Sequence, residues 1–334
     1  MSRFRLLSIA AITSVLALVA LPAQASDDAR FGEQWSLQKI GAPAAWAAST
    51  GAGVRIGIVD TGVDLTHEDL AGKVVADTSC VGAKGDPAKC AGSGQDEQGH
   101  GTHVSGIAAA SKDNHVGIAG VAPGADLVVA KVLSAAGSGT TEDINAGIRW
   151  VVDHGAKVVN LSLGDPNYLI TSLQGTPLSE GIQYAWAHGA IPVVASGNTN
   201  PGGIGLLGSS DYGNLNAIIV GATGPNDEVA PYSSPLGNAK WSIMAPGGNG
   251  GGTPAGDILS SIWKKGQQNQ YAALAGTSMA SPHVTGAVAL LLARGLGQQQ
   301  VVDRLLSTAN HSVSCGLNSP TCAGRLDVAK ATAG

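Results

Sequence analysis

The chain has 334 residues, of which 44% are hydrophobic and 13% charged, and this apolar content excludes a disordered protein. Its 19 Lys and Arg residues against 24 Asp and Glu residues give a net charge of −5, which argues against nucleic acid as a partner. The 48 glycines follow no Gly-X-Y period, so a collagen-like chain is also excluded. The length allows one large domain or two ordinary ones.

The first 25 residues predict a signal peptide. Arg3 and Arg5 precede the apolar run Leu6–Leu21, and Ala23-Gln24-Ala25 fits the small-x-small cleavage rule. The alternative is a membrane anchor, but the run is short for a span of about 20 residues. We therefore expect a secreted or periplasmic protein that has no membrane contact after cleavage.

Buried strands and amphipathic helices alternate along the rest of the chain. Apolar, β-branched runs predict strands at Val54–Val59, Leu127–Val132, Lys157–Leu161, Ile191–Ala195 and Ala217–Val220. Apolar stripes predict one helix that follows Thr140 and carries Ile144, Ile148, Val151 and Val152, and a second that carries Ile182, Ala185 and Trp186. The alternation predicts a three-layer α/β domain with a mainly parallel sheet and right-handed crossovers.

Four cysteines allow three disulfide pairings. We predict the local one, Cys80–Cys90 with Cys315–Cys322, which closes two short loops and contributes roughly 2–3 kcal/mol per bridge in the chain-entropy model. A zinc site is the alternative. Zinc ligands usually come as C-x₂₋₄-C pairs, and neither spacing in this sequence fits.

Three segments carry residues suited to chemistry. Asp60 ends a predicted strand, and α/β proteins place their sites at that edge of the sheet. His100 and His103 are spaced i, i+3 in a Gly-rich segment, which fits either a metal site or two core histidines. Ser278 precedes Pro282, and because proline is tolerated in a first helical turn, we expect this serine near a helix N-terminus. Such a terminus favours developing negative charge, although Ser278 could also be an ordinary N-cap.

Together these motifs resemble the subtilisin-like serine proteases, or subtilases. Val59–Gly62, Gly99–Gly106 and Gly276–Gly286 resemble the family's Asp, His and Ser motifs, in the family's order. Residues 193–198, Val-Val-Ala-Ser-Gly-Asn, resemble the segment that carries the oxyanion asparagine. The resemblance runs from about Trp35 to about Ala329 and is closest to the secreted bacterial, thermitase-like branch.

The resemblance implies a serine endopeptidase with Asp60, His100 and Ser278 as a catalytic triad, in one peptidase domain over residues 35–334. Asn198 would stabilise the oxyanion, and His103 and His283 would be structural. Residues 26–34 would form a short N-terminal segment that leaves no room for a propeptide. The same fold without activity, used for binding, and a peptide ligase or cyclase that uses the same acyl-enzyme are the alternatives. Since all four catalytic-type residues are present, we favour hydrolysis.

By the same resemblance, an extended protein or peptide substrate would bind along two short segments and a set of pocket residues. Apolar residues in these pockets would give broad specificity with an apolar preference. The implied substrate-binding residues are Leu133, Gly137, Ser138, Gly139, Ile144, Ser162, Leu163, Gly164, Ala195, Ser196 and Gly197. We expect a monomer that needs no cofactor for catalysis.

A structural calcium ion is also implied. Asp69 matches a position at which subtilases bind calcium, and the loop that holds Asn114, Val116 and Ile118 matches the other half of that site. Carboxylate, amide and carbonyl oxygens suit Ca²⁺, whereas the alternative is a plain polar loop. Gln34 is the candidate N-terminal ligand.

Overall fold

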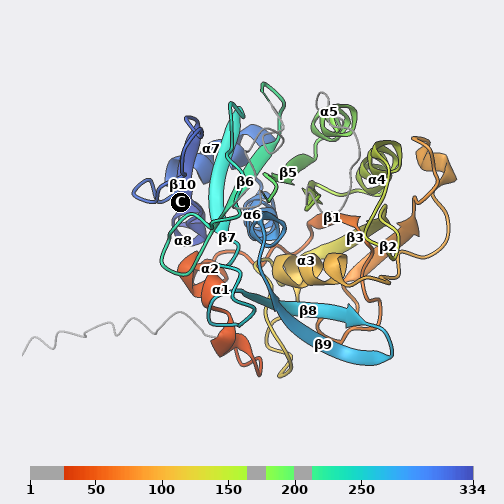
Figure 1. The fold of residues 1–334 in the computed structure, drawn as a ribbon, viewed down its shortest axis with the longest axis horizontal. Helices are drawn as coiled ribbons and strands as arrows, with labels where there is room; N and C mark the ends of the chain where they lie inside the picture. The colour runs from red at the N-terminus through yellow and green to blue at the C-terminus, as the bar shows by residue number, and fades with distance from the viewer. Residues whose placement is uncertain (1–25, 164–177, 199–212, 334) are drawn as a thin grey trace, which may run out of the picture.

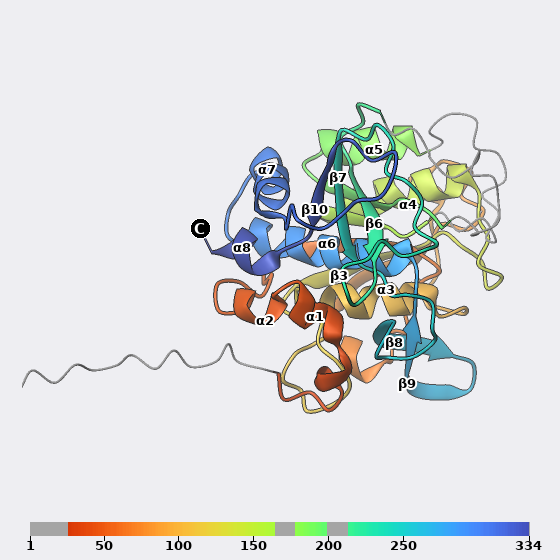
Figure 2. The same ribbon diagram turned by 60° about the vertical axis from the view of Figure 1, so that its left-hand side comes forward.

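The fold is described from a computed structural model that covers residues 26–163, 178–198 and 213–333 (Figures 1 and 2). The predicted signal peptide and the predicted substrate-binding residue Gly164 lie outside the described residues. Within the described part of the chain, no helix is long and apolar enough to cross a membrane.

A twisted sheet of eight strands runs through the molecule in the order β10-β7-β6-β5-β4-β1-β3-β2. Every neighbouring pair in this sheet is parallel. A separate antiparallel hairpin pairs β8 with β9. The strands are β1 (Arg55–Asp60), β2 (Val74–Ser79), β3 (Asp126–Lys131), β4 (Val158–Leu161), β5 (Ile191–Ala195), β6 (Ile218–Thr223), β7 (Trp241–Pro246), β8 (Ile258–Lys264), β9 (Gln267–Leu274) and β10 (Cys322–Arg325).

Helices cover both faces of the sheet (Figure 2). They are α1 (Trp35–Lys39), α2 (Ala42–Ala45), α3 (His100–Ala109), α4 (Thr141–Asp153), α5 (Ser179–Ala187), α6 (Thr277–Leu292), α7 (Gln298–Thr308) and α8 (Val328–Thr332), with 3₁₀ turns η1 (Phe31–Glu33), η2 (Glu68–Leu70) and η3 (Pro87–Lys89). The parallel sheet between two helical layers confirms the predicted three-layer α/β fold.

Alternate residues of the central strands feed two separate cores. In β3, Leu127 and Val129 pack in the core that contains Val104 of α3 and Val284 of α6. Val128 and Ala130 point the other way, into the core that is shared with α4 and α5. A strand buried on both faces is a continuous apolar run because neither side meets water.

The helix α6 is buried along almost its whole length, and it departs from one prediction. Pro282 lies inside α6 rather than in its first turn. A proline cannot donate to the carbonyl four residues earlier, so the Ser278 carbonyl loses its usual helical partner. The Ser162 hydroxyl donates to that carbonyl at 2.8 Å instead, which satisfies the backbone and ties the start of α6 to the end of β4.

Candidate active site

Asp60 is the last residue of β1, between β3 and β4, and its side chain is fully buried. Its backbone carbonyl accepts hydrogen bonds from the N–H groups of Val132 and Leu133, which fix the strand end. Carboxylate Oδ1 accepts from the Thr61 N–H at 2.7 Å and lies 2.8 Å from His100 Nδ1. A buried carboxylate in this position selects the tautomer with a proton on Nδ1, which leaves Nε2 free of its proton.

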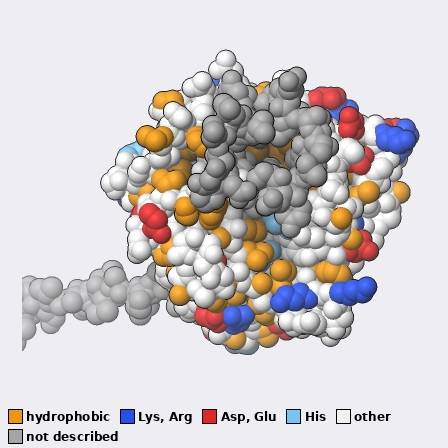
Figure 3. All heavy atoms as spheres, viewed as in Figure 1, with side chains coloured by type: hydrophobic (Ala, Val, Ile, Leu, Met, Phe, Trp, Pro, Cys, Tyr) orange, Lys and Arg blue, Asp and Glu red, His pale blue; other side chains and the backbone are white. Residues whose placement is uncertain are grey.

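His100 is the first residue of α3, and its side chain is 21% exposed. The helix approaches β1 closely because Gly101 has no side chain: a Cβ there would lie 2.1 Å from the Gly62 carbonyl oxygen. Figure 3 shows histidine atoms among apolar side chains near the middle of one face of the molecule. The Asp60 contact therefore holds Nδ1, and the imidazole faces solvent in part.

Asp96 connects the segments that carry Asp60 and His100, and it was not predicted from the sequence. Its carboxylate is fully buried and accepts from the Thr61 hydroxyl at 2.9 Å. The backbone N–H groups of Gln98, Gly99 and Thr102 donate to it at 2.9, 2.9 and 3.0 Å, and the Thr102 hydroxyl donates at 2.5 Å. One carboxylate thus joins the residue after Asp60 to the first turn of α3.

Ser278 is the second residue of α6 and is 6% exposed. Its hydroxyl donates to the Ser162 carbonyl at 3.3 Å, and its own carbonyl accepts from the Ser162 hydroxyl. The serine therefore lies against the carboxyl end of β4, the strand next to the one that ends in Asp60. Its position at a helix start agrees with the prediction, and the dipole of α6 favours a negative charge near that end of the helix.

Asn198 follows β5 and points its side chain at the start of α6. Its Oδ1 accepts from the Thr277 N–H at 3.0 Å and from the Thr277 hydroxyl at 3.1 Å. The same hydroxyl accepts from the Gly197 N–H at 3.1 Å, so its proton is available for Asn198. With Oδ1 engaged on Thr277, the amide presents Nδ2 as a donor, and a Cβ on Gly276 would lie 3.5 Å from it. Thr277 orients this amide and was not singled out from the sequence.

Three predicted pocket residues share one apolar core. Leu133, Ile144 and Leu163 are 8%, 0% and 5% exposed and belong to the cluster on the α4 and α5 side of the sheet. Leu133 follows β3, Ile144 lies in the first turn of α4, and Leu163 follows β4. The three side chains thus belong to one buried cluster, although they come from separate elements.

The other predicted substrate-binding residues lie in two short segments. Residues 134–138 form a tight turn, in which Ser134 N–H donates to the Ser138 carbonyl and Gly137 N–H to the Ser134 carbonyl. A Cβ on Gly139 would lie 2.4 Å from the Val132 carbonyl oxygen, so a larger residue would displace this segment. Ala195 ends β5, and Ser196 donates to the Val220 carbonyl from its backbone and to the Ser234 carbonyl from its hydroxyl.

The two other histidines of these motifs are fully buried and contact backbone carbonyls. His103 Nε2 lies 3.0 Å from the Ala272 carbonyl, and burial lowers the pKa of His103 to about 3. His283 Nδ1 lies 2.8 Å from the Met279 carbonyl, and burial lowers its pKa to about 4. Since His100 faces Asp60 while His103 faces β9, the two imidazoles are used separately rather than on one metal ion.

Asp69 lies beside the loop that contains Asn114 and Ile118. Asn114 Nδ2, the Ile118 N–H and the Tyr271 hydroxyl donate to its carboxylate at 3.1, 3.0 and 2.8 Å. The Val116 N–H donates to Asn114 Oδ1 at 3.2 Å. Burial raises the pKa of Asp69, so the site favours neutralisation of that charge.

The N-terminal side of this cluster differs from the prediction. Gln34 uses both ends of its amide on the backbone of Ala119, at 2.8 and 2.9 Å. Asp28, 5% exposed, instead accepts from the Asn114 N–H at 3.0 Å. Two buried carboxylates therefore flank Asn114, a setting that suits a hard cation. No group of three or more His, Cys, Asp and Glu side chains among the described residues could hold a metal, so amide and carbonyl oxygens would have to contribute.

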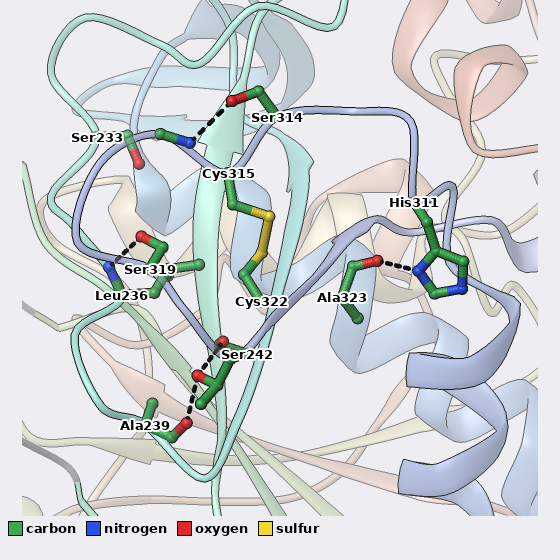
Figure 4. The surroundings of a disulfide bond; sticks show 12 residues. Ser233, Leu236, Ala239, Ser242, His311, Ser314, Cys315, Ser319, Cys322 and Ala323 are labelled. Carbon is green, nitrogen blue, oxygen red and sulfur yellow. Dashed lines mark hydrogen bonds between the residues drawn. A yellow bond between two sulfur atoms is a disulfide. The ribbon is translucent and has the colours of Figure 1, made fainter.

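Both predicted disulfides are present, one near each edge of the large sheet. Cys80 directly follows the edge strand β2 and is joined to Cys90. Cys322 begins the opposite edge strand β10 and is joined to Cys315. Around this second bridge, the hydroxyls of Ser314 and Ser319 accept from the N–H groups of Gly316 and Leu236, which joins the loop to the segment before β7 (Figure 4).

Comparison with known proteins agrees with this geometry. The model of the subtilase family, Peptidase_S8, matches residues 51–324. Thermitase from Thermoactinomyces vulgaris is 38% identical over 277 residues, which cover 83% of this chain and 88% of that protein. Subtilisin DY from Bacillus licheniformis is 39% identical over 267 residues, 78% of this chain and 85% of the other. A solved protease structure from Pseudoalteromonas arctica matches with a TM-score of 0.77 and 27% identity, over 93% of this chain and 99% of that one.

A parallel α/β sheet with a serine at a helix start and a histidine on a buried carboxylate defines the class of serine peptidases built on this fold. The chain belongs to the subtilase family, and it is a serine endopeptidase.

Proposed function

We propose that the chain hydrolyses peptide bonds through a covalent acyl-enzyme on Ser278. The observation that carries this proposal is the 2.8 Å contact between His100 Nδ1 and the fully buried Asp60, at the sheet edge where α6 begins. A serine hydroxyl becomes a nucleophile when a base accepts its proton and a third group orients that base.

A residue can be assigned to each step of acylation and deacylation. Ser278 Oγ attacks the scissile carbonyl carbon while its proton passes to His100 Nε2. The C–N bond breaks as His100 gives this proton to the leaving amine, and the acyl group stays esterified to Ser278. Water attacks the ester next, losing its proton to His100, which returns it to Ser278 Oγ as the acid leaves. Asp60 accepts the Nδ1–H throughout and stabilises the imidazolium.

The negative charge on the tetrahedral intermediate would be met by two donors, Asn198 Nδ2 and the Ser278 N–H. Two observations support this role: the engagement of Asn198 Oδ1 by Thr277, which turns Nδ2 away, and the position of Ser278 in the first turn of α6. Donors fixed before the reaction stabilise the developing charge without having to reorganise.

We further propose broad specificity with a preference for apolar residues upstream of the cleaved bond. The apolar residues Leu133, Ile144 and Leu163, gathered in one cluster, support this preference. Residues 195–197 would line the pocket for the residue immediately before the cleaved bond. An apolar pocket discriminates weakly between apolar side chains, by roughly 10–200-fold per methylene, so the preference should be graded rather than strict.

Export to an oxidising compartment is part of the proposal, with cleavage after Ala25, a single peptidase domain from residue 35, and a monomeric enzyme. The two disulfides support this environment, because such bonds persist mainly outside the cytosol. Sequencing the N-terminus of the exported protein tests the cleavage site, and light scattering tests the monomer.

A structural calcium ion is proposed near Asp69 and Asn114. Asp28, Asp69, Asn114 and the carbonyls of Val116 and Ile118 would hold it, and the ion would neutralise carboxylates that are buried together. Differential scanning calorimetry tests this: added Ca²⁺ should raise Tm relative to EDTA, and Asp69→Asn should remove that difference. An identical Tm with Ca²⁺ and with EDTA would rule out the ion.

The catalytic proposal is tested with casein and a serine-directed phosphonate. We expect casein fragments, and a single covalent label that mass mapping assigns to Ser278. The Ser278→Ala variant should fold, take up no label and lose activity by about 10⁶-fold in kcat, the scale known for subtilisin. A label on another residue would contradict the assignment, labelling without hydrolysis would favour a binding role, and ligated peptides would favour a transferase.

A further inference from the structure

The loop closed by the Cys80–Cys90 disulfide is fastened to the end of the neighbouring strand. Cys80 N–H donates to the Lys131 carbonyl at 2.7 Å, and Lys131 is the last residue of β3. Ala91 N–H returns to the Ser79 carbonyl at 2.8 Å, so both ends of the loop meet at the sheet edge. We call residues 80–90 the disulfide loop.

A buried carboxylate fastens the same loop to a helix. Asp143, in the first turn of α4 and 4% exposed, accepts from the N–H groups of Gly82 and Lys84, each at 2.8 Å. Gly82 and Lys84 have φ of +84° and +51°, a left-handed conformation that turns both N–H groups to one side. The negative charge is also favourable at that end of α4. The left-handed shape of the loop and the dipole at the N-terminus of α4 therefore both favour this contact with the Asp143 carboxylate.

The two attachment points are next to residues of the proposed apolar pocket. Lys131 is two residues before Leu133, and Asp143 directly precedes Ile144. Inside the loop, Cys80 and Ala83 are 0% and 1% exposed and pack in the same cluster as Leu133, Ile144 and Leu163. The loop thus belongs to the same buried cluster as the pocket residues and is bound to β3 and α4, next to Leu133 and Ile144.

We propose that the disulfide loop, anchored by Asp143, determines specificity by holding the pocket formed by Leu133 and Ile144 at a width that accepts a large apolar residue of the substrate. This inference rests on the proposed function, which assigns that pocket to the substrate. Asp143 acts as a positioning residue, because it contacts the loop rather than the reacting atoms. Without the anchor, β3 and α4 can shift relative to each other, and the pocket loses its fit to large side chains.

The test compares peptides that carry either Leu or Ala at one of the second to fourth positions before the cleaved bond. For the native enzyme, the ratio of kcat/KM for the Leu peptide to that for the Ala peptide measures how strongly the pocket prefers the larger side chain. We expect Asp143→Ala, and separately Cys80→Ser/Cys90→Ser, to lower this ratio about tenfold at one position. The kcat/KM for the Ala peptide should stay within about twofold, since that side chain does not fill the pocket.

The second disulfide supplies the matched control. The Cys315→Ser/Cys322→Ser variant removes a bridge at the opposite edge of the sheet, so it can lower Tm but should leave the ratio unchanged (Figure 4). Asp143→Asn, which retains one acceptor oxygen, covers the case in which Asp143→Ala does not fold. Active variants at Asp143 and at Cys80/Cys90 that keep the native ratio overturn the proposal. A native enzyme that cleaves neither peptide and takes up no label at Ser278 overturns the proposed function first.

Discussion

At the scale of single residues, the side chain of Asn198 gives a sharp prediction. It faces charge that would exist only on the tetrahedral intermediate, so its loss should weaken binding of the transition state and not of the substrate. We expect Asn198→Ala to lower kcat by about 10²–10³-fold, the scale known for subtilisin, with little change in KM. Steady-state kinetics on a peptide substrate measures both constants.

The control for this variant is Asn216→Ala, which removes an asparagine that binds the Lys240 ammonium at the surface. It should leave kcat and KM unchanged. A loss in Asn198→Ala that appears only in KM would mean that this side chain binds substrate in its ground state.

Asp96 gives a second prediction at this scale. Replacing it with Asn keeps its size but turns an NH₂ group toward N–H and O–H donors, and each buried hydrogen bond lost costs roughly 1–3 kcal/mol. We expect Asp96→Asn to lower Tm and to lower kcat about tenfold, because the start of α3 is no longer fixed to Thr61. Proton NMR of the hydrogen between His100 Nδ1 and Asp60 checks the mechanism, since this resonance should shift or broaden.

Asp143→Asn is the matched control for Asp96→Asn, because it also places an amide beside buried backbone N–H groups but away from His100. In Asp143→Asn, the resonance of the hydrogen between His100 Nδ1 and Asp60 should match that of the native enzyme. If Asp96→Asn lowers Tm but leaves both kcat and the resonance native, Asp96 stabilises the fold without positioning the histidine.

The sequence predicted the residues whose chemistry is visible in a motif and missed those that act through geometry. Asp60, His100, Asn198 and Ser278 stand in recognisable segments. Asp96 instead binds backbone N–H groups and hydroxyls, and any Asp in a loop would look the same until the chain is folded. Thr277 stands in the Ser motif, but its two hydrogen bonds to Asn198 form only in the folded chain. The contact of Gln34 is of the same kind: its amide binds Ala119, a partner 85 residues away, which no local pattern indicates.

At the scale of elements, Pro282 and Ser162 form a pair that a double-mutant cycle can test. Ser162→Ala alone removes the donor to the Ser278 carbonyl, which Pro282 cannot replace, and should cost roughly 1–3 kcal/mol. In a Pro282→Ala background, the new N–H can donate to that carbonyl, so the same substitution should cost less. Urea unfolding of the four variants should give a coupling of about 1 kcal/mol or more.

The bond from Asn160 to the Ser162 hydroxyl is lost in both backgrounds and so cancels in the cycle. Strictly additive free energies of unfolding would show that the Ser278 carbonyl does not depend on this hydroxyl.

The strands that were predicted are buried on both faces, although the fully buried strand β7 was not predicted. All five predicted strands are present with ends shifted by up to three residues, as for Ala217–Val220 against β6. The edge strand β2 and the hairpin strand β9 were missed because they are partly exposed and polar: β2 includes Asp77 and Thr78, and β9 begins with Gln267 and Gln268. Their pairing comes from partners far along the chain, which a local pattern does not contain.

At the scale of the whole molecule, the buried histidines predict how stability depends on pH. An imidazole in the unfolded chain titrates near about 6.5, whereas burial lowers the pKa of His103 to about 3 and of His283 to about 4. Between these values the unfolded chain binds protons that the folded chain does not, so the free energy of unfolding falls as pH falls from about 6.5 toward 4. Above about pH 7 both states hold neutral imidazoles, and this contribution is constant.

We therefore expect the free energy of unfolding to drop between pH 7 and pH 4, with His283 alone contributing on the order of 3 kcal/mol. Asp69 acts in the opposite direction near the acid end, because its raised pKa favours proton uptake by the folded state. His283→Gln removes one titrating group and should make the decline shallower by that amount. Urea unfolding at several pH values, in the Ser278→Ala background to prevent self-digestion, measures the slope.

The control for the histidine variant is His188→Gln, at an exposed position just after the C-terminus of α5. This substitution also removes an imidazole but leaves the core intact, so it measures what the loss of a surface histidine does to the slope. Equal slopes for His283→Gln and the parent would mean that the His283 imidazole keeps the same proton affinity in both states, and that acid destabilises the enzyme through other groups.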